Sequence, residues 1–291
     1  MNESSIEPGN RPAGIPIVPG LPPFGALTLG ALGVCVVSGI ILLTGFEPAR
    51  ALPSTLAFET GRPFGWFVRN LHAWSATLAF LALLAHTADH VIRQADRSTP
   101  PLTWLALVAS LPTTLYLMLG GRAMPGDAEA SGISAVLHGI LARLPLAGTA
   151  AASFLVGPGG ADPHVLLAHH VATATLALAL ITVFHIRKLA PEPLSVAVAL
   201  GLAGLVSLFA RPSLVAVPLD GHLRGPWYMG GLRLTLEHVP VWLGGLVFPG
   251  AFLLGLAALP LLSDRGARFL RIALSVALAA YVAVTLAAVR Q

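Results

Sequence analysis

Ten histidines occur in this chain of 291 residues, and several lie in apolar stretches. The segment HAWSATLAFLALLAH has His72 at one end, His86 at the other and no charged residue between them. A second apolar stretch contains His170 and His185. Burying a histidine in such surroundings is costly unless its ring nitrogens are bonded. These residues are therefore candidates for metal ligands, or for neutral side chains that bond a nearby carbonyl group.

Helical geometry predicts that each pair lies on one face. A helix turns about 100° and rises about 1.5 Å per residue, so His72 and His86 differ by about 40° and 21 Å. His170 and His185, one residue further apart, differ by about 60° and 22 Å. His169 lies about 160° from His185, and we expect it to face elsewhere.

The two pairs predict two sites, one above the other. If the two helices run in the same direction, His72 faces His170 at one level, and His86 faces His185 at the other. A planar metal macrocycle with two axial imidazoles requires such a pair, whereas zinc requires more ligands than two. His90 also shares a face with His72, but the two lie about 27 Å apart along the helix. No two histidines in the stretch of His170 and His185 have that separation.

The elements that carry these histidines are predicted to be membrane-spanning helices. The chain is 55% hydrophobic and 10% charged, and a helix needs about 20 apolar residues to cross a bilayer. We therefore expect an all-α protein with seven transmembrane helices, the fifth of them short. The expected spans are 24–45, 71–90, 102–121, 165–185, 194–210, 240–262 and 269–289.

The predicted spans divide the chain into three parts and fix an orientation. Residues 1–23 form an N-terminal tail, 24–190 a four-helix bundle with the histidines, and 191–291 a three-helix extension. The short loops are rich in arginine and lysine, which places them and the N-terminus in the cytoplasm, at a bacterial-type inner membrane. The single cysteine, Cys35, excludes an internal disulfide. The net charge of +4 is spread over the loops and does not indicate a nucleic-acid partner.

Several segments resemble the cytochrome b family, the membrane core of cytochrome bc complexes. The similar segments are GWFVRNLHAWSA at 65–76, PLTW at 101–104, GGRAMPGD at 120–127 and HIRK at 185–188. The fifteen-residue histidine spacing is similar to that of the short chloroplast-type branch, whose four-helix and three-helix subunits would here be fused in one chain.

The resemblance implies a cofactor set and the residues that hold it. Two non-covalent b-type haems would be bound by the four histidines, with a propionate of one haem on Arg69. Gly25, Gly39 and Gly121 match family glycines that let haem approach the backbone. Leu107 stands where the family has a further glycine, and Pro23 where the chloroplast branch attaches a covalent haem. Cys35 is then expected to be a small core residue.

The last third resembles the family's quinol site but departs from it. In GPWYMGGLRLTLEHVPVWLGG at 225–245, Trp227 and Tyr228 match the family tetrad Pro-Glu-Trp-Tyr, but Pro226 replaces its proton-accepting glutamate. The nearest acids in the sequence are Asp220 and Glu237. The outer quinol site is therefore rebuilt or lost. The better candidate for a quinone site lies at the inner face, near Arg187 and Lys188.

The resemblance implies a subunit of a quinol:acceptor oxidoreductase that moves electrons across the bilayer. Its expected partners are membrane lipid, quinone, and an iron–sulfur protein or cytochrome c subunit on the outer face; the family is dimeric, so a homodimer is a further expectation. Pro226 keeps an alternative open: a dihaem conduit for another redox module, without its own quinol oxidation. A haem-free scaffold is a third alternative.

Overall fold

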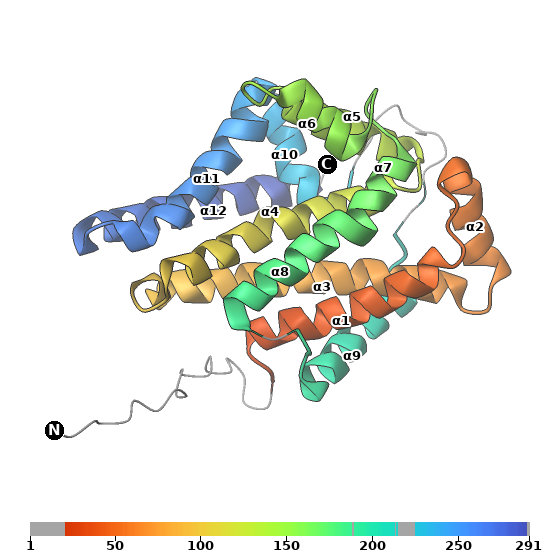
Figure 1. Cartoon of the computed structure of the whole chain (residues 1–291), viewed down its shortest axis with the longest axis horizontal. Coiled ribbons are helices and arrows are strands. Elements are labelled where there is room, and N and C mark those ends of the chain that lie inside the picture. Colours follow the sequence, from red (N-terminus) through yellow and green to blue (C-terminus); the bar gives the residue numbers. More distant parts are fainter. Residues whose placement is uncertain (1–20, 188, 213, 215–224, 290–291) are drawn as a thin grey trace.

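The regular elements of this computed structural model are all helices in the residues it describes, 21–187, 189–212, 214 and 225–289 (Figure 1). The all-α expectation is confirmed. The main helices are α1 (Phe24–Leu43), α3 (Gly65–Ile92), α4 (Pro101–Ala123), α8 (Ala174–Ile186), α9 (Pro193–Phe209), α11 (Phe248–Ala258) and α12 (Asp264–Val289). Shorter ones are α2 (Ala51–Gly61), α5 (Ala128–Leu141), α6 (Gly148–Val156), α7 (Pro163–Ala168) and α10 (Gly230–Leu236).

Irregular turns extend two of the long helices. The π-turn η3 (His169–Thr173) joins α7 to α8 in one continuous helix, Pro163–Ile186. The π-turn η5 (Leu243–Val247) and the 3₁₀ turn η6 (Leu259–Leu261) extend α11 at its two ends. Three further 3₁₀ turns, η1 (Pro48–Arg50), η2 (Ala95–Arg97) and η4 (Trp227–Met229), lie in the connections.

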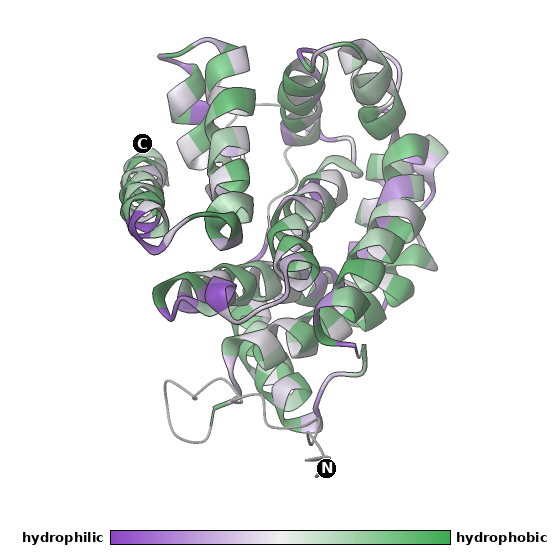
Figure 2. Cartoon of the chain, turned by 60° about the vertical axis from the view of Figure 1, so that its left-hand side comes forward, coloured by the Kyte–Doolittle hydropathy of each residue, from purple (hydrophilic) through white to green (hydrophobic). Residues whose placement is uncertain are grey.

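Six of the described helices are long and apolar enough to cross a membrane. They are α1, α3, α4, α7–α8, η5–η6 with α11, and α12. Many of their large apolar side chains are exposed. Figure 2, coloured by hydropathy, shows that most of the length of these helices is hydrophobic. α9 has 17 residues, about 25 Å of helix. A Cβ on Gly30 would meet Ser195 at the start of α9, and Asn70 donates to Ser207 near its end. α9 thus runs between the two ends of the bundle, and the count of seven crossings stays a prediction.

The helices that carry the histidines form the centre of the molecule. α3 packs along α1, and α8 packs along α4. α9 packs against α1 and α3, whereas α11 packs against α4 on the opposite side of the bundle (Figure 1). The indole of Trp104 is fully buried there and donates to the Leu256 carbonyl at 2.7 Å. The last three long helices therefore lie on two sides of the central four, and the division of the chain at residue 190 stays a prediction.

Buried ion pairs and tight turns fix the two ends of the bundle. At one end, which we call inner, Arg271 of α12 donates to both carboxylate oxygens of the buried Asp96 at 2.7 Å. At the other, outer end, α2 turns sharply into α3 at Gly65, where a Cβ would lie 2.0 Å from the Phe58 carbonyl oxygen. That approach is possible only for glycine, and it holds α2 against the start of α3.

Candidate functional site

The four histidines come together in two facing pairs. The ring centres of His72 and His170 lie 6.1 Å apart at the outer end, and those of His86 and His185 lie 5.9 Å apart at the inner end. A metal–imidazole bond is about 2 Å long and the ring centre lies about 1 Å behind the nitrogen, so two axial imidazoles on one metal have centres about 6 Å apart. Both pairs fit that requirement.

A π-turn explains why unequal spacings give matching pairs. The histidines are fourteen residues apart on α3 but fifteen apart on the helix of His170. The turn η3, which contains His170, is wound as a π-helix and takes up one extra residue. Fifteen residues then cover the rotation of fourteen α-helical ones, about 40°, instead of the 60° expected for a regular helix. The side chain of Thr175 donates to the His170 carbonyl beside this turn.

His169 points away from the His72–His170 pair, as its angle of about 160° from His185 around the helix predicted. Its ring is buried against Phe154, with ring centres 4.7 Å apart. The Nε2–H group donates to the Phe154 carbonyl at 2.7 Å. His169 therefore joins the outer end of this helix to α6.

Glycines lie directly against three of the four imidazoles. A Cβ on Gly39 would be 2.9 Å from His72 Cε1, on Gly121 2.8 Å from His170 Cε1, and on Gly25 3.0 Å from His86 Cε1. A side chain at any of these three positions would collide with the imidazole itself. The resemblance to the family had implied a collision with the haem macrocycle instead. The absence of a side chain at these glycines therefore leaves room for each imidazole beside the neighbouring helix.

Backbone carbonyls orient two of the rings. The Nδ1–H group of His72 donates to the Cys35 carbonyl at 2.9 Å, and that of His185 donates to the Thr103 carbonyl at 3.1 Å. In this tautomer Nε2 is the nitrogen that can accept a metal bond, and such Nδ1–H bonds commonly fix metal-binding imidazoles. The Cys35 sulfur lies 3.5 Å from His72 Nδ1, so Cys35 borders the outer pair.

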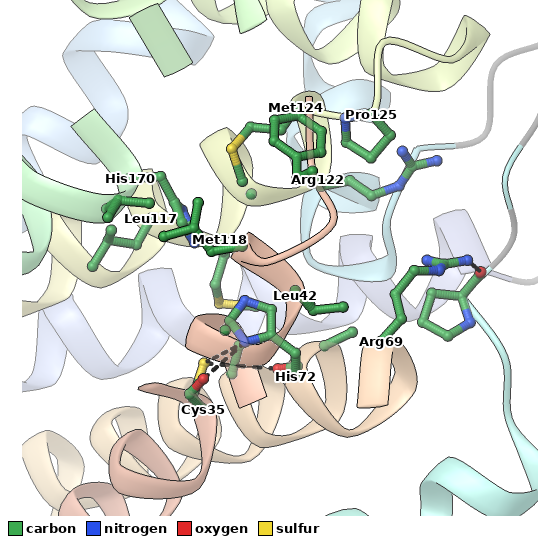
Figure 3. A pocket seen from close by; sticks show the side chains of 18 of the residues that line it. Cys35, Leu42, Arg69, His72, Leu117, Met118, Arg122, Met124, Pro125 and His170 are labelled. Atoms are coloured by element: carbon green, nitrogen blue, oxygen red, sulfur yellow. Dashed lines mark hydrogen bonds between the residues drawn. The ribbon is translucent and has the colours of Figure 1, made fainter. Parts of the chain in front are cut away.

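The outer pair borders a cavity of about 460 Å³. In Figure 3 the rings of His72 and His170 lie on one side of it, and the guanidinium groups of Arg69 and Arg122 on the other. The Arg69 side chain donates to Glu59 at 2.9 Å and to the Pro212 carbonyl at 2.6 Å. The residue expected to bind a propionate thus lines the cavity and already has a carboxylate neighbour.

Trp227 and Tyr228 line the same outer cavity. The Tyr228 hydroxyl donates to the Met118 carbonyl at 3.3 Å, and burial raises the pKa of this hydroxyl. The aromatic pair thus borders the cavity of the outer histidines, while Trp227 is also partly exposed at the surface. Its role as a quinone contact stays a prediction.

The described acids around this aromatic pair include a group that was not expected from the sequence. Asp220 lies outside the described residues, and Glu237 is half exposed and pairs with Arg233 at 3.0 Å. Instead, Arg122 on the cavity wall pairs with both Asp127 and Glu129. Sequence reasoning missed this group because nearly a hundred residues separate Glu129 from Tyr228.

The inner pair borders a larger cavity of about 1030 Å³. Leu107 lies on its wall, where a glycine had been expected from the family pattern. The polar side chains on the wall include Asp89, His90, Arg93 and Glu192. Both cavity volumes suit cofactor-sized ligands, which occupy pockets of about 300–1,000 Å³.

His90 was not expected at the inner pair. Its ring centre lies 4.1 Å from that of His86 and 6.5 Å from that of His185, and its Nδ1 bonds the His86 carbonyl at 3.0 Å. Arg187 is exposed at the end of α8, in a left-handed conformation, and is not on the cavity wall. Lys188 lies outside the described residues. The quinone role of Arg187 and Lys188 stays a prediction.

Comparison with known proteins places this geometry in a family. The profile of the Cytochrome b/b6/petB family matches residues 17–190. Cytochrome b6 of Tupiella akineta is 26% identical over 162 residues, which cover 55% of this chain and 75% of that protein. A cytochrome bc complex cytochrome b subunit of Chlorobaculum thiosulfatiphilum is 30% identical over 104 residues, 35% of this chain and 24% of that protein.

A solved structure shares the fold. A chain of a hyperthermophilic respiratory Complex III superposes with a TM-score of 0.69 at 18% identity, over 91% of this chain and 83% of that one. The match covers more of the chain than the family profile does, so it extends into the last third of the chain. The chain is therefore an integral membrane protein, and it belongs to the Cytochrome b/b6/petB family.

Proposed function

We propose that this cytochrome b binds two non-covalent b-type haems and carries electrons across the bilayer between them. His72 and His170 would bind the outer haem, and His86 and His185 the inner one. The two facing imidazole pairs are the observation that carries the proposal. Fourteen residues of α3 separate the two levels by about 21 Å, and a haem at each level divides the crossing into shorter steps.

The chain's own residues would hold the haems and set their surroundings. Haem supplies the one-electron chemistry. The carbonyls of Cys35 and Thr103 orient imidazoles, and Gly39, Gly121 and Gly25 let three of the rings pack closely. The guanidinium of Arg69 suits a propionate, because it forms charge-assisted bonds to carboxylates.

The outer cavity supports a role in quinol oxidation. It joins the outer histidines to Trp227 and Tyr228, the residues that resemble the family's quinol segment. The electrons would pass to an iron–sulfur protein or a cytochrome c subunit on the outer face. The bc-complex subunit and the Complex III chain among the similar proteins favour such an assembly. We place the protein in a bacterial-type inner membrane with its N-terminus in the cytoplasm. Arg93 and Arg97 lie in a short loop at the same end of the bundle as the start of α1, and short basic loops face the cytoplasm.

A haem count tests the main proposal. The purified protein should contain two b-type haems per chain in a pyridine haemochrome assay, with a reduced-minus-oxidised spectrum of low-spin bis-histidine iron. One haem or none per chain would overturn the dihaem assignment. A haem-free protein with intact helical content would support a scaffold role.

Pro226 favours a second candidate, a dihaem conduit without its own quinol oxidation. In a conduit, electrons enter from another redox module and quinol does not react in the outer cavity. The two candidates differ in their response to a non-oxidisable quinol analogue. If the analogue blocks reduction of the haems by a short-chain naphthoquinol, the oxidoreductase is supported. If reduction continues unchanged, the conduit is supported.

A further inference from the structure

Arg69, the residue proposed to bind a haem propionate, already has a carboxylate partner in this structure. Its Nε–H group donates to the Glu59 carboxylate at 2.9 Å, and an Nη2–H group donates to the Pro212 carbonyl at 2.6 Å. A guanidinium has five N–H donors, so the others can still bond a ligand in the cavity. Arg69 lines the outer cavity together with His72 and His170, whereas Glu59 does not. The Glu59 charge therefore lies directly behind a cation of the outer cavity.

We propose that the Glu59 carboxylate lowers the reduction potential of the outer haem by offsetting the charge of Arg69, and so favours electron transfer from the outer haem to the inner one. The inference rests on the proposed binding of two haems. It adds a residue that lines neither cavity. Glu59 would act through Arg69, as a positioning residue for the charge at the outer site.

The turn between α2 and α3 places Glu59 beside Arg69. A Cβ on Gly65 would lie 2.0 Å from the Phe58 carbonyl oxygen, so the two helices are in close contact at the residue that precedes Glu59. The Phe58 side chain is buried and lines the outer cavity. From the next position, the Glu59 carboxylate reaches Arg69 in the second turn of α3. A turn that requires glycine therefore fixes the ion pair at the cavity wall.

The nearest arginine in the sequence has other partners. Arg62 follows Glu59 by three residues, but its guanidinium donates to the Thr44 hydroxyl at 2.7 Å and to the Thr44 carbonyl at 3.1 Å. It also lies 4.9 Å from the centre of the Phe58 ring. These contacts join the end of α2 to the end of α1. The Glu59 carboxylate thus pairs with the arginine of the cavity, and the fold selects that partner over the local one.

The ion pair is shielded from solvent, so its charges act on the cavity. The side chains of Arg69 and Glu59 are only 14% and 18% exposed. Charges in such surroundings are screened less than charges at an open surface. Arg69 lies three residues before His72, less than one turn of α3. Reduction of a haem adds an electron, so a nearby cation favours the ferrous state and a nearby carboxylate the ferric state.

The electron step that Glu59 would favour needs no other reactant. One electron leaves the ferrous iron of the outer haem and reduces the ferric iron of the inner haem, and no bond forms or breaks. The step is favourable when the outer potential lies below the inner one. Removal of the Glu59 charge should therefore make it less favourable.

A purely structural role for Glu59 gives a different expectation. In that case its side chain only orients the Arg69 guanidinium, and glutamine, which also accepts a hydrogen bond, can replace it. The outer potential in Glu59→Gln would then stay the same, or fall if Arg69 moved away from the cavity. Glu59→Gln removes one negative charge and changes no other group, so an electrostatic role requires the potential to rise.

The test is a spectroelectrochemical titration of the purified full-length protein. At the natural midpoint of the outer haem, Glu59→Gln should raise the ratio of ferrous to ferric outer haem at least threefold, with both haems retained and the inner midpoint unchanged. Glu59→Asp keeps the charge and should stay within twofold of the natural ratio. Glu47→Gln is the matched control, because it removes an exposed carboxylate that pairs with Arg50 and lines neither cavity. Its ratio should not change.

A double substitution keeps the test decisive if Glu59→Gln alone loses haem. Arg69→Gln leaves Glu59 without its guanidinium, so the ferrous fraction of the outer haem should fall. The double variant Glu59→Gln/Arg69→Gln lacks both charges, and its ratio should be at least threefold above that of Arg69→Gln. Equal ratios in these two variants, or an unchanged or lower ratio in Glu59→Gln, would overturn the role of Glu59. Loss of the outer haem from both Glu59→Gln and the double variant would also overturn it, because Glu59 would then be needed to bind the haem.

The haem count separates this inference from the proposed function. If the natural protein contains two haems and the Glu59 variants show no shift, only the role of Glu59 is rejected. If the natural protein contains fewer than two haems, the dihaem proposal fails, and the inference fails with it.

Discussion

The outer and inner histidine pairs have nearly the same ring separation but different surroundings. At the outer pair, Gly39 and Gly121 lie against both imidazoles, whereas at the inner pair Gly25 lies against one and Leu107 occupies the wall. The inner pair also has a third imidazole, His90, beside it. The spacing of each histidine pair is therefore set by the two helices that carry the histidines, while the shape and polarity of each pocket are set by the residues around it.

The largest expected effect comes from the ligands themselves. His170→Ala should remove the outer haem only, and His185→Ala the inner haem only, so each variant should contain half of the haem in a pyridine haemochrome assay. His169→Ala is the control, because its ring bonds α6 and not the pair. Loss of a haem on changing His169 alone would show that the pairing has been assigned to the wrong residue.

The glycine asymmetry gives the next effect. Gly121→Leu should abolish or strongly reduce outer haem binding, because its Cβ alone would lie 2.8 Å from His170 Cε1. The reverse change, Leu107→Gly, should leave both haems bound and lower stability, since removal of a buried leucine side chain costs roughly 2–5 kcal/mol. Haem content and the thermal midpoint of each variant measure the difference. If Gly121→Leu contained as much haem as the natural protein, the conclusion that the outer pocket requires a glycine where the inner pocket has a leucine would be wrong.

Arg69 tests the electrostatics of the outer pocket alone. Arg69→Ala should lower the reduction potential of the outer haem by tens of millivolts, because a nearby cation favours the ferrous state and two charges in such surroundings interact by a few kcal/mol at most. The inner haem, a helix length away, should keep its potential. Spectroelectrochemical titration separates the two. A shift confined to the inner haem would contradict the assignment of Arg69 to the outer one.

His90 should give the smallest effect. Its ring lies beside His86 without facing an iron in the proposed arrangement, so His90→Ala should retain both haems and alter only the spectrum or potential of the inner one. The outer pair has Cys35 beside His72 where the inner pair has His90 beside His86, so no equivalent substitution can be made there. Complete loss of the inner haem in His90→Ala would mean that His90, and not His86, is the ligand.

Local periodicity was enough to predict which histidines share one face of a helix. The helical turn placed His72 and His86 on one face, and it separated His169 from His170. The apolar composition predicted an all-α membrane protein, and the structure and the family match confirm it. These conclusions need only the residue spacing within one helix, because the backbone fixes the angle between side chains on the same helix.

Contacts between distant segments could not be obtained in this way. The π-turn at His170 corrected a spacing that a regular helix would have misaligned, and nothing in the local residue pattern predicted it. Likewise, Arg122 and Glu129 join Tyr228, and His90 joins the inner pair, only because packing brings those segments together. The sequence by itself determined the histidines and the helices that hold them. The tertiary structure alone decided which acids and bases surround each pair, since that depends on how helices far apart in the chain pack against one another.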